Sequence, residues 1–254
     1  MIVDVLRHPT SQDLAEDVAA RTITTLVQRI ADAGTAHVCL TGGGIGTASL
    51  AAIAERPGAD AVDWGRVHVW WGDERFLPRD DPERNETAAR RALLDHVAVR
   101  PDHVHAMPSS DSCADVDTGA AEYTRELLAW ARPGEAVPSM DILMLGVGPD
   151  GHVASLFPEL PAVHDTRWVA GVHGSPKPPP LRITLTLPTI RSAQEVWLLA
   201  AGTEKARAVR LALTPGAGPW QVPAAGARGR RRTLVLVDDG AAGQLPSDLG
   251  RPSA

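Results

Sequence analysis

The chain has 254 residues, of which 44% are hydrophobic and 22% are charged, as in ordinary folded globular proteins rather than disordered ones. The formal net charge of −6 argues against a broad basic surface for nucleic acid. No apolar run is long enough to predict a membrane span, and we expect no signal peptide. Among the 25 basic residues only Lys177 and Lys205 are lysines.

Apolar segments of strand length alternate with helical patterns along the chain. A helix is predicted over 11–33, where apolar residues recur at helical spacing and Ser11 is the expected N-cap. Further helices are predicted near 46–55, 117–131 and 203–213, with a short one after 237. Strands are predicted at 38–41, 67–71, 141–145, 196–201 and 233–237, with a strand-like segment at 182–187.

Continuous apolar strands that alternate with helices are typical of a parallel sheet covered on both faces. We therefore predict an α/β fold of three layers, a mostly parallel Rossmann-like sheet between helices, and a single domain over residues 1–254. Ligands of such sheets bind beyond the carboxyl ends of the strands. Four of these ends carry glycines or charged residues, which locates a candidate site there.

The first of these strand ends is the turn Thr41-Gly42-Gly43-Gly44. Its glycines leave backbone N–H groups open at a helix start, where the helix dipole also favours phosphate. A simple tight turn is the alternative. A dinucleotide fingerprint is excluded because Ser49 occupies the position of its third glycine, and no P-loop lysine follows.

The second strand end is the charged triplet Asp73-Glu74-Arg75. It is either the rim of a site or an exposed loop salt bridge, which would add little stability. The polar segment 78–85, ending at Asn85, is long enough to fold over a ligand.

The third strand end carries Asp150-Gly151-His152 within a glycine-rich turn. Histidine titrates near neutral pH and can take a proton from water, and a nearby carboxylate can orient it. The alternative is a structural histidine held by hydrogen bonds. A metal site is not expected, because the other histidines lack compact ligand spacing.

The fourth strand end is Gly202-Thr203-Glu204-Lys205, where Thr203 is the expected helix cap. A cation in the first turn of a helix is disfavoured by the helix dipole, which suggests an anionic partner for Lys205, either phosphate or Glu204. Lys177 lies in a proline-rich loop and either reaches the same space or faces solvent.

With these motifs the chain resembles the 6-phosphogluconolactonases, enzymes of the oxidative pentose phosphate pathway. The matching stretches are the glycine turn and the segments 71–85, 140–158, 182–188 and 202–206, in the family's order. The family's turn usually reads Ser-Gly-Gly-Ser, so the hydroxyl at position 44 is absent here. Backbone N–H groups, Thr41 and Thr47 would then contact the phosphate.

The resemblance implies a cytoplasmic enzyme that hydrolyses 6-phospho-D-glucono-1,5-lactone to 6-phosphogluconate without a metal or organic cofactor, as a monomer or small homo-oligomer. The expected catalytic residues are His152, Asp150 and Arg75, with Arg75 on either the phosphate or the oxyanion. The expected substrate-binding residues are Thr41, Gly42, Gly43, Gly44, Asp73, Glu74, Asn85, Gly151, Lys177, Arg182 and Lys205. The two cysteines, Cys39 and Cys113, are expected to be free thiols.

Two other functions compete with this one. Glucosamine-6-phosphate deaminases share the Asp-Gly-His core but place a glutamate five residues after the histidine, where this chain has Phe157. A phenyl ring cannot shuttle a proton, which favours the lactonase. A non-catalytic sugar-phosphate sensor would need an attached DNA-binding module, and it would bind ligand without hydrolysing it.

Overall fold

The computed structural model describes residues 2–247 and 249–252. Its main sheet has seven strands in the order β10-β1-β9-β8-β5-β2-β3, and every pairing between neighbours is parallel. The strands are β1 (Ile2–His8), β2 (Ala36–Leu40), β3 (Val67–Trp71), β5 (Ile142–Gly146), β8 (Glu195–Ala200), β9 (Arg232–Asp238) and β10 (Arg251–Pro252). The predicted parallel sheet is confirmed.

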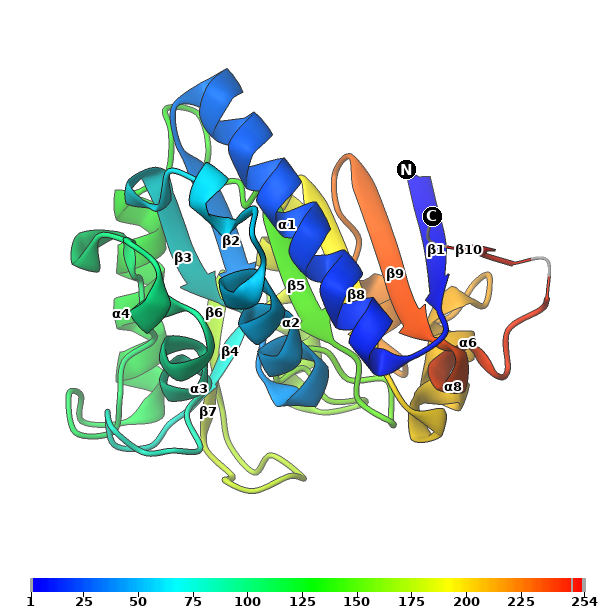
Figure 1. The fold of residues 1–254 in the computed structure, drawn as a ribbon. Helices are drawn as coiled ribbons and strands as arrows, with labels where there is room; N and C mark the ends of the chain where they lie inside the picture. The colour runs from blue at the N-terminus through cyan, green and yellow to red at the C-terminus, as the bar shows by residue number, and fades with distance from the viewer. Residues whose placement is uncertain (1, 248, 253–254) are drawn as a thin grey trace.

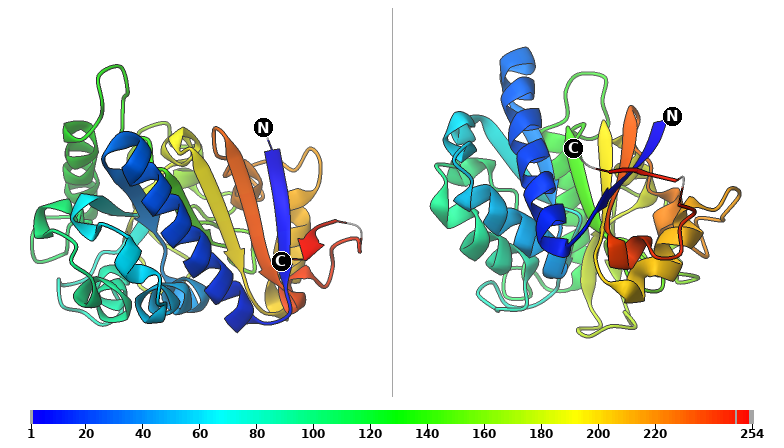
Figure 2. Two further views of the ribbon diagram at one scale, coloured as in Figure 1. Left: turned by 45° about the horizontal axis from the view of Figure 1, so that its top comes forward. Right: turned by 45° about the vertical axis from the view of Figure 1, so that its right-hand side comes forward.

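Helices cover both faces of this sheet. Figure 1 shows α1 and α2 in front of the strands and α4 behind β3, and the views of Figure 2 agree. The α-helices are α1 (Ser11–Ala33), α2 (Gly43–Glu55), α3 (Asn85–Ala92), α4 (Val116–Ala129), α5 (Leu187–Ser192), α6 (Ala206–Leu213), α7 (Pro223–Gly226) and α8 (Asp239–Ala242). Among the described residues, none of these helices is long and apolar enough to cross a membrane.

A second, antiparallel sheet lies beside the first, in the order β4-β7-β6. Its strands are β4 (Asp73–Arg75), β6 (Val169–Val172) and β7 (Arg182–Leu185). The sequence indicated only β7 as a strand. Strands this short carry little periodic signal, and β4 pairs with β7 across more than a hundred residues of intervening chain, as between Asp73 and Thr184.

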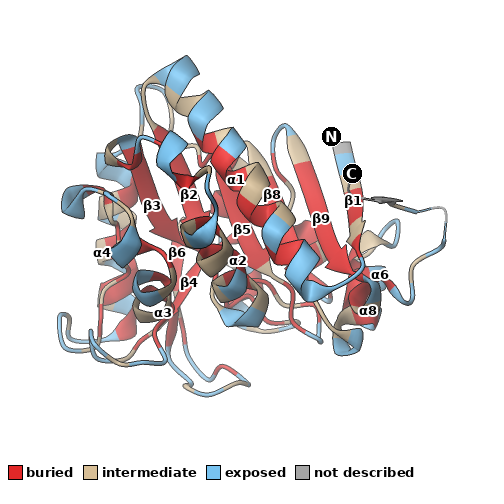
Figure 3. Ribbon diagram, in the orientation of Figure 1, coloured by how far each residue is buried: buried red, intermediate tan, exposed pale blue. Residues whose placement is uncertain are grey.

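The core lies between the main sheet and its helices. The five residues of β2 and of β3 are all buried, as the continuous apolar pattern predicted. On α1 the buried face includes Leu14, Val18 and Leu26, while the other side of the helix is exposed (Figure 3). This packing fixes the carboxyl ends of the strands along one edge of the sheet.

Two predicted helix caps are wrong. The N-cap of α1 is Thr10 rather than Ser11, because Thr10 Oγ1 accepts from the Asp13 backbone N–H at 3.1 Å and Asp13 accepts in return from Thr10 N–H, a capping box. Thr203 caps no helix. It opens a 3₁₀ turn (Thr203–Lys205) ahead of α6.

Candidate active site

A cavity of about 440 Å³ opens at the carboxyl ends of β2, β5 and β8, where the sequence located the site. The sequence-predicted residues that line it are Thr41, Gly42, Gly43, Gly44, Asp73, Arg75, Asn85, His152, Lys177, Arg182 and Lys205. These residues come from segments more than 160 positions apart in the chain, and the parallel sheet brings their ends together.

The imidazole of His152 faces this cavity with Asp150 at its side. Nδ1 of His152 lies 2.5 Å from Oδ1 of Asp150. Because an ionised carboxylate only accepts hydrogen bonds, Nδ1 carries a proton, so that in the neutral imidazole the lone pair is on Nε2. The turn permits this approach only with glycine at position 148, since a Cβ there would lie 2.0 Å from Nδ1 of His152.

The charge of Asp150 is maintained by its partner. Partial burial alone would raise the pKa of Asp150, but the hydrogen bond and charge of His152, with backbone hydrogen bonds, outweigh burial and lower it to about 2. The buried ring of Phe157 also lies beside the imidazole, 4.6 Å away between ring centroids. The imidazole of His152 therefore has one orienting carboxylate and one apolar neighbour.

The glycine turn leads directly into α2. Its N-cap Gly42 has no side chain with which to cap the helix, so the first N–H groups of α2 keep no side-chain partner. The Thr41 hydroxyl oxygen accepts from the backbone N–H of Gly146 at 3.1 Å, and its O–H remains a donor. The side chain of Thr47, expected at the phosphate, does not line the cavity.

Cationic side chains dominate the lining of the cavity. Arg75, Lys177, Arg182 and Lys205 face it, together with the carboxylates of Asp73 and Glu204. Burial lowers the pKa of Lys177, as do Lys205 and Arg182, while Asp150 opposes them. Lys177 thus lines the cavity and is only partly exposed, and the charge of this lining suits an anionic ligand.

Most of the guanidinium of Arg182 binds the chain itself. Its Nη2 donates to the carbonyl oxygens of Lys177 and Pro178 at 3.1 and 3.0 Å, and Nε donates to Pro179 O at 3.2 Å. Nη1 lies 3.8 Å from Asp73 Oδ2. Arg182 thus fastens the loop that carries Lys177, a role that the sequence did not indicate.

Asp73 connects the segment that follows His152 with the start of α3. Its Oδ2 accepts from the hydroxyl of Ser155 at 2.7 Å, and its backbone oxygen accepts from Asn85 Nδ2 at 2.9 Å. Ser155 belongs to the segment after His152, so Asp73 joins that segment to the start of α3. The sequence did not single out Ser155, because a serine in an apolar stretch carries no distinctive signal, and it indicated Glu204 only as an alternative partner of Lys205.

Two predicted binding residues lie outside the cavity lining. Glu74 is only 1% exposed, and both of its carboxylate oxygens accept backbone N–H groups. Burial raises its pKa to about 7, against the opposing effect of Arg84 and of those hydrogen bonds. Gly151 shapes the turn, with its carbonyl accepting from Ala224 N–H at 3.0 Å. In the described structure both residues therefore hold neighbouring backbone in place and do not line the cavity.

The described residues include no group of three His, Cys, Asp or Glu side chains that could hold a metal ion.

Arg75 brings a guanidinium group to the cavity. Its Nη1 donates to Glu83 O, while its Nε is buried without a hydrogen-bond partner in the described structure. The site can therefore supply a proton acceptor, guanidinium and ammonium cations, and open backbone N–H groups.

The chain matches one protein family over most of its length. The model of the family described as glucosamine-6-phosphate isomerases/6-phosphogluconolactonase matches residues 9–236. A 6-phosphogluconolactonase of Streptomyces coelicolor is 58% identical, over 97% of this chain and 96% of that protein. One of Mycobacterium tuberculosis is 48% identical, over 94% of this chain and 97% of the other.

Solved structures show the same fold. A 6-phosphogluconolactonase from Thermotoga maritima has a TM-score of 0.80 at 25% identity, covering 93% of this chain and 99% of its own. That of Trypanosoma brucei has a TM-score of 0.80 at 26% identity, covering 96% and 98%. A monomeric glucosamine-6-phosphate deaminase shares the fold at a TM-score of 0.77 and 20% identity, over 95% of this chain and 99% of its own.

Proposed function

The chain belongs to the glucosamine-6-phosphate isomerase/6-phosphogluconolactonase family, and we infer that it hydrolyses 6-phospho-D-glucono-1,5-lactone to 6-phosphogluconate, with His152 as the general base. The observation that carries the proposal is the pair of Asp150 and His152 at the wall of a cation-lined cavity. Lactone hydrolysis needs an activated water, stabilisation of an oxyanion and a proton for the leaving ring oxygen, and this cavity has groups for all three.

The proton passes through the imidazole in two steps. Nε2 of His152 takes a proton from water as the water oxygen attacks the lactone carbonyl. Asp150 accepts from Nδ1–H and stabilises the imidazolium that forms. When the tetrahedral intermediate collapses, Nε2–H gives the proton to the ring oxygen. Assistance of this kind typically contributes ~10²–10⁴-fold to the rate.

The substrate's phosphate is bound by the glycine turn and the lysines. The free N–H groups at the start of α2 and the ammonium groups of Lys205 and Lys177 face one cavity. The guanidinium of Arg75 meets either the phosphate or the developing oxyanion. All of these groups come from one chain, so the proposed mechanism works in a monomer. Its proton transfers use side chains alone and call for no metal or organic cofactor.

The residue at position 157, beside His152, distinguishes a lactone hydrolase from a deaminase. A glutamate at position 157 is the proton shuttle that the resemblance assigns to the deaminases. Here the Phe157 ring packs 4.6 Å from the imidazole and is 1% exposed, so no ionisable group occupies that place.

We place this enzyme in the cytoplasm, a reducing compartment that suits its two free thiols, Cys39 and Cys113.

A direct assay tests the proposal. The purified protein is given the phosphorylated lactone, with 6-phosphogluconate as the readout, and separately glucosamine 6-phosphate, with ammonia as the readout. Hydrolysis well above the rate without protein, and no ammonia, is the expected result. Ammonia release without lactone hydrolysis would assign the deaminase function, and binding of the lactone without turnover would assign a sensor.

A further inference from the structure

The carboxylate of Glu74 connects two segments that border the cavity. Its Oε1 accepts from the backbone N–H groups of Arg75 and Asn85, at 2.8 and 2.7 Å. Its Oε2 accepts from the backbone N–H of Glu86 at 2.8 Å. One buried side chain on β4 therefore holds its own neighbour and the first two residues of α3.

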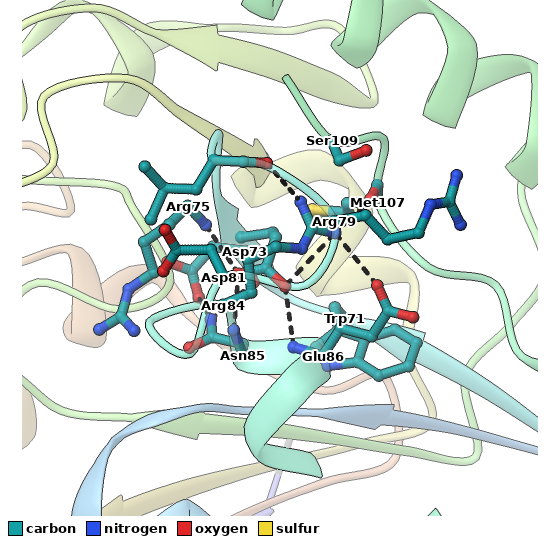
Figure 4. A network of polar contacts seen from close by, with 12 residues as sticks. Trp71, Asp73, Arg75, Arg79, Asp81, Arg84, Asn85, Glu86, Met107 and Ser109 are labelled. Carbon is teal, nitrogen blue, oxygen red and sulfur yellow. Dashed lines mark hydrogen bonds and ion pairs between the residues drawn. The ribbon is translucent and has the colours of Figure 1, made fainter. Parts of the chain in front are cut away.

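This arrangement replaces an ordinary helix cap. The N-cap of α3 is Arg84, whose side chain makes no capping hydrogen bond, so Glu74 supplies the acceptor from a different element. Arg84 is 1% exposed and its Nη2 lies 3.8 Å from Glu74 Oε2. The same nitrogen donates to Glu86 Oε2 at 3.1 Å and to Met107 O at 2.8 Å, as Figure 4 shows.

The residues held by Glu74 are parts of the substrate cavity. Arg75 and Asn85 both line it, from the two ends of the intervening loop. Asn85 also packs against the glycine turn, since a Cβ at Gly42 would lie 2.0 Å from Asn85 Oδ1. A shift of α3 would therefore move Asn85 away from both Asp73 and the turn.

We propose that Glu74 is a positioning residue, which holds Arg75 and Asn85 in the places from which they meet the substrate. This inference rests on the proposed lactone hydrolysis. Glutamine is the informative replacement because it keeps the shape but has a single acceptor oxygen, and its NH₂ group would face a backbone donor. The loop ends then lose at least one of the hydrogen bonds that fix them.

Glu86 offers a matched control. It is 5% exposed and pairs with Arg84 and Arg90, at 3.1 and 2.9 Å, so it is also a buried, ion-paired carboxylate at the same helix start. Its side chain makes no hydrogen bond to Arg75 or Asn85 in the described chain. Replacing Glu86 by Gln therefore perturbs the same charge cluster without releasing the cavity residues.

The test compares kcat and KM of wild type, Glu74→Gln and Glu86→Gln on the phosphorylated lactone, with circular dichroism to establish that each is folded at the assay temperature. We expect kcat/KM to fall roughly tenfold to a hundredfold in Glu74→Gln, as for a small misplacement of binding groups, and to stay within about twofold in Glu86→Gln. Asn85→Ala, alone and combined with Glu74→Gln, gives a double-mutant cycle in which the combined loss is smaller than the product of the single losses.

Full activity of a folded Glu74→Gln, an equal loss in Glu86→Gln, or losses that multiply in the cycle would each overturn the positioning role. If Glu74→Gln does not fold, Glu74→Asp replaces it, because its shorter side chain cannot reach both loop ends, and the same outcomes apply. Failure of the proposed function itself is distinguishable, because wild type would then not hydrolyse the lactone at all.

Discussion

Nδ1 of His152 donates to Oδ1 of Asp150 across 2.5 Å, within a turn whose glycine at position 148 leaves room for the imidazole. The hydrogen bond fixes which nitrogen of the ring is protonated, and so which one faces the cavity as a base. The carboxylate that orients the base is thus two residues away from it in the chain, and the local turn builds the pair.

Replacing Asp150 by Asn should lower kcat by roughly 10²-fold or more, because the amide neither stabilises the imidazolium nor enforces the tautomer. Steady-state kinetics on the phosphorylated lactone measure the change. Asp102→Asn is the matched control, since Asp102 also accepts from a nearby cation, Arg100, on the surface. Equal activity of Asp150→Asn and wild type would contradict an orienting role for Asp150.

Adding one methyl group at Gly148 should abolish activity in a protein that still folds. The new Cβ would lie 2.0 Å from Nδ1 of His152, so the imidazole must move away from its partner. In Gly58→Ala the added Cβ meets its nearest neighbour, Ile23, at 3.8 Å, and this control should behave as wild type. An active, folded Gly148→Ala would show that the described position of the imidazole is not the catalytic one.

Lys205→Met should raise KM by about tenfold or more while changing kcat much less, because the lost charge serves binding of the phosphate rather than the proton transfers. Arg207, an exposed cation two residues further along, provides the control Arg207→Met, for which KM should be unchanged. An unaltered KM in Lys205→Met would remove this lysine from the phosphate site.

A cluster of histidines far from the cavity should make the free energy of unfolding depend on pH. The rings of His37 and His68 stack at 4.5 Å, and those of His68 and His103 at 3.9 Å. Burial, with the neighbouring histidines, lowers the pKa of His37 to about 3 and that of His68 to about 4. Below the ordinary value of 6.5 the unfolded chain therefore binds more protons than the folded one.

Stability contributed by these rings is present above pH 6.5 and is lost as the pH falls towards 4. Between pH 8 and 5, wild type should lose about 2 kcal/mol more free energy of unfolding than His68→Phe, which has one such imidazole fewer. Urea unfolding at both pH values measures this difference. Glu74, whose pKa is raised, changes the free energy of unfolding in the opposite direction, but it does so in both proteins and therefore cancels in the comparison. Parallel pH profiles for the two proteins would contradict the assignment of the neutral form to His68.

The sequence predicted the parts of the fold that local pattern determines. The fully buried strands β2 and β3 and the long helix α1 follow from hydrophobic periodicity and continuous apolar runs. The small antiparallel sheet could not be found in this way, because β4 and β6 have only three and four residues, and β4 pairs with a strand distant in the chain.

The sequence likewise predicted some residues of the candidate site and not the orientation of others. Residues at strand ends, such as His152 and Lys205, were predicted because the parallel sheet dictates where they gather. The direction of a buried polar side chain was beyond sequence reasoning: Glu74 and Arg75 are neighbours of opposite charge, yet one is turned into the protein and the other towards the cavity. Only the hydrogen bonds of the folded chain distinguish them.

The central claim is that the imidazole of His152 activates the attacking water. The most direct measurement is the rate of 6-phosphogluconate formation by His152→Ala, corrected for spontaneous hydrolysis, together with its thermal melt. We predict hydrolysis at or near the background rate in a protein that melts close to wild type. A folded His152→Ala that hydrolyses the phosphorylated lactone as fast as wild type would contradict the mechanism.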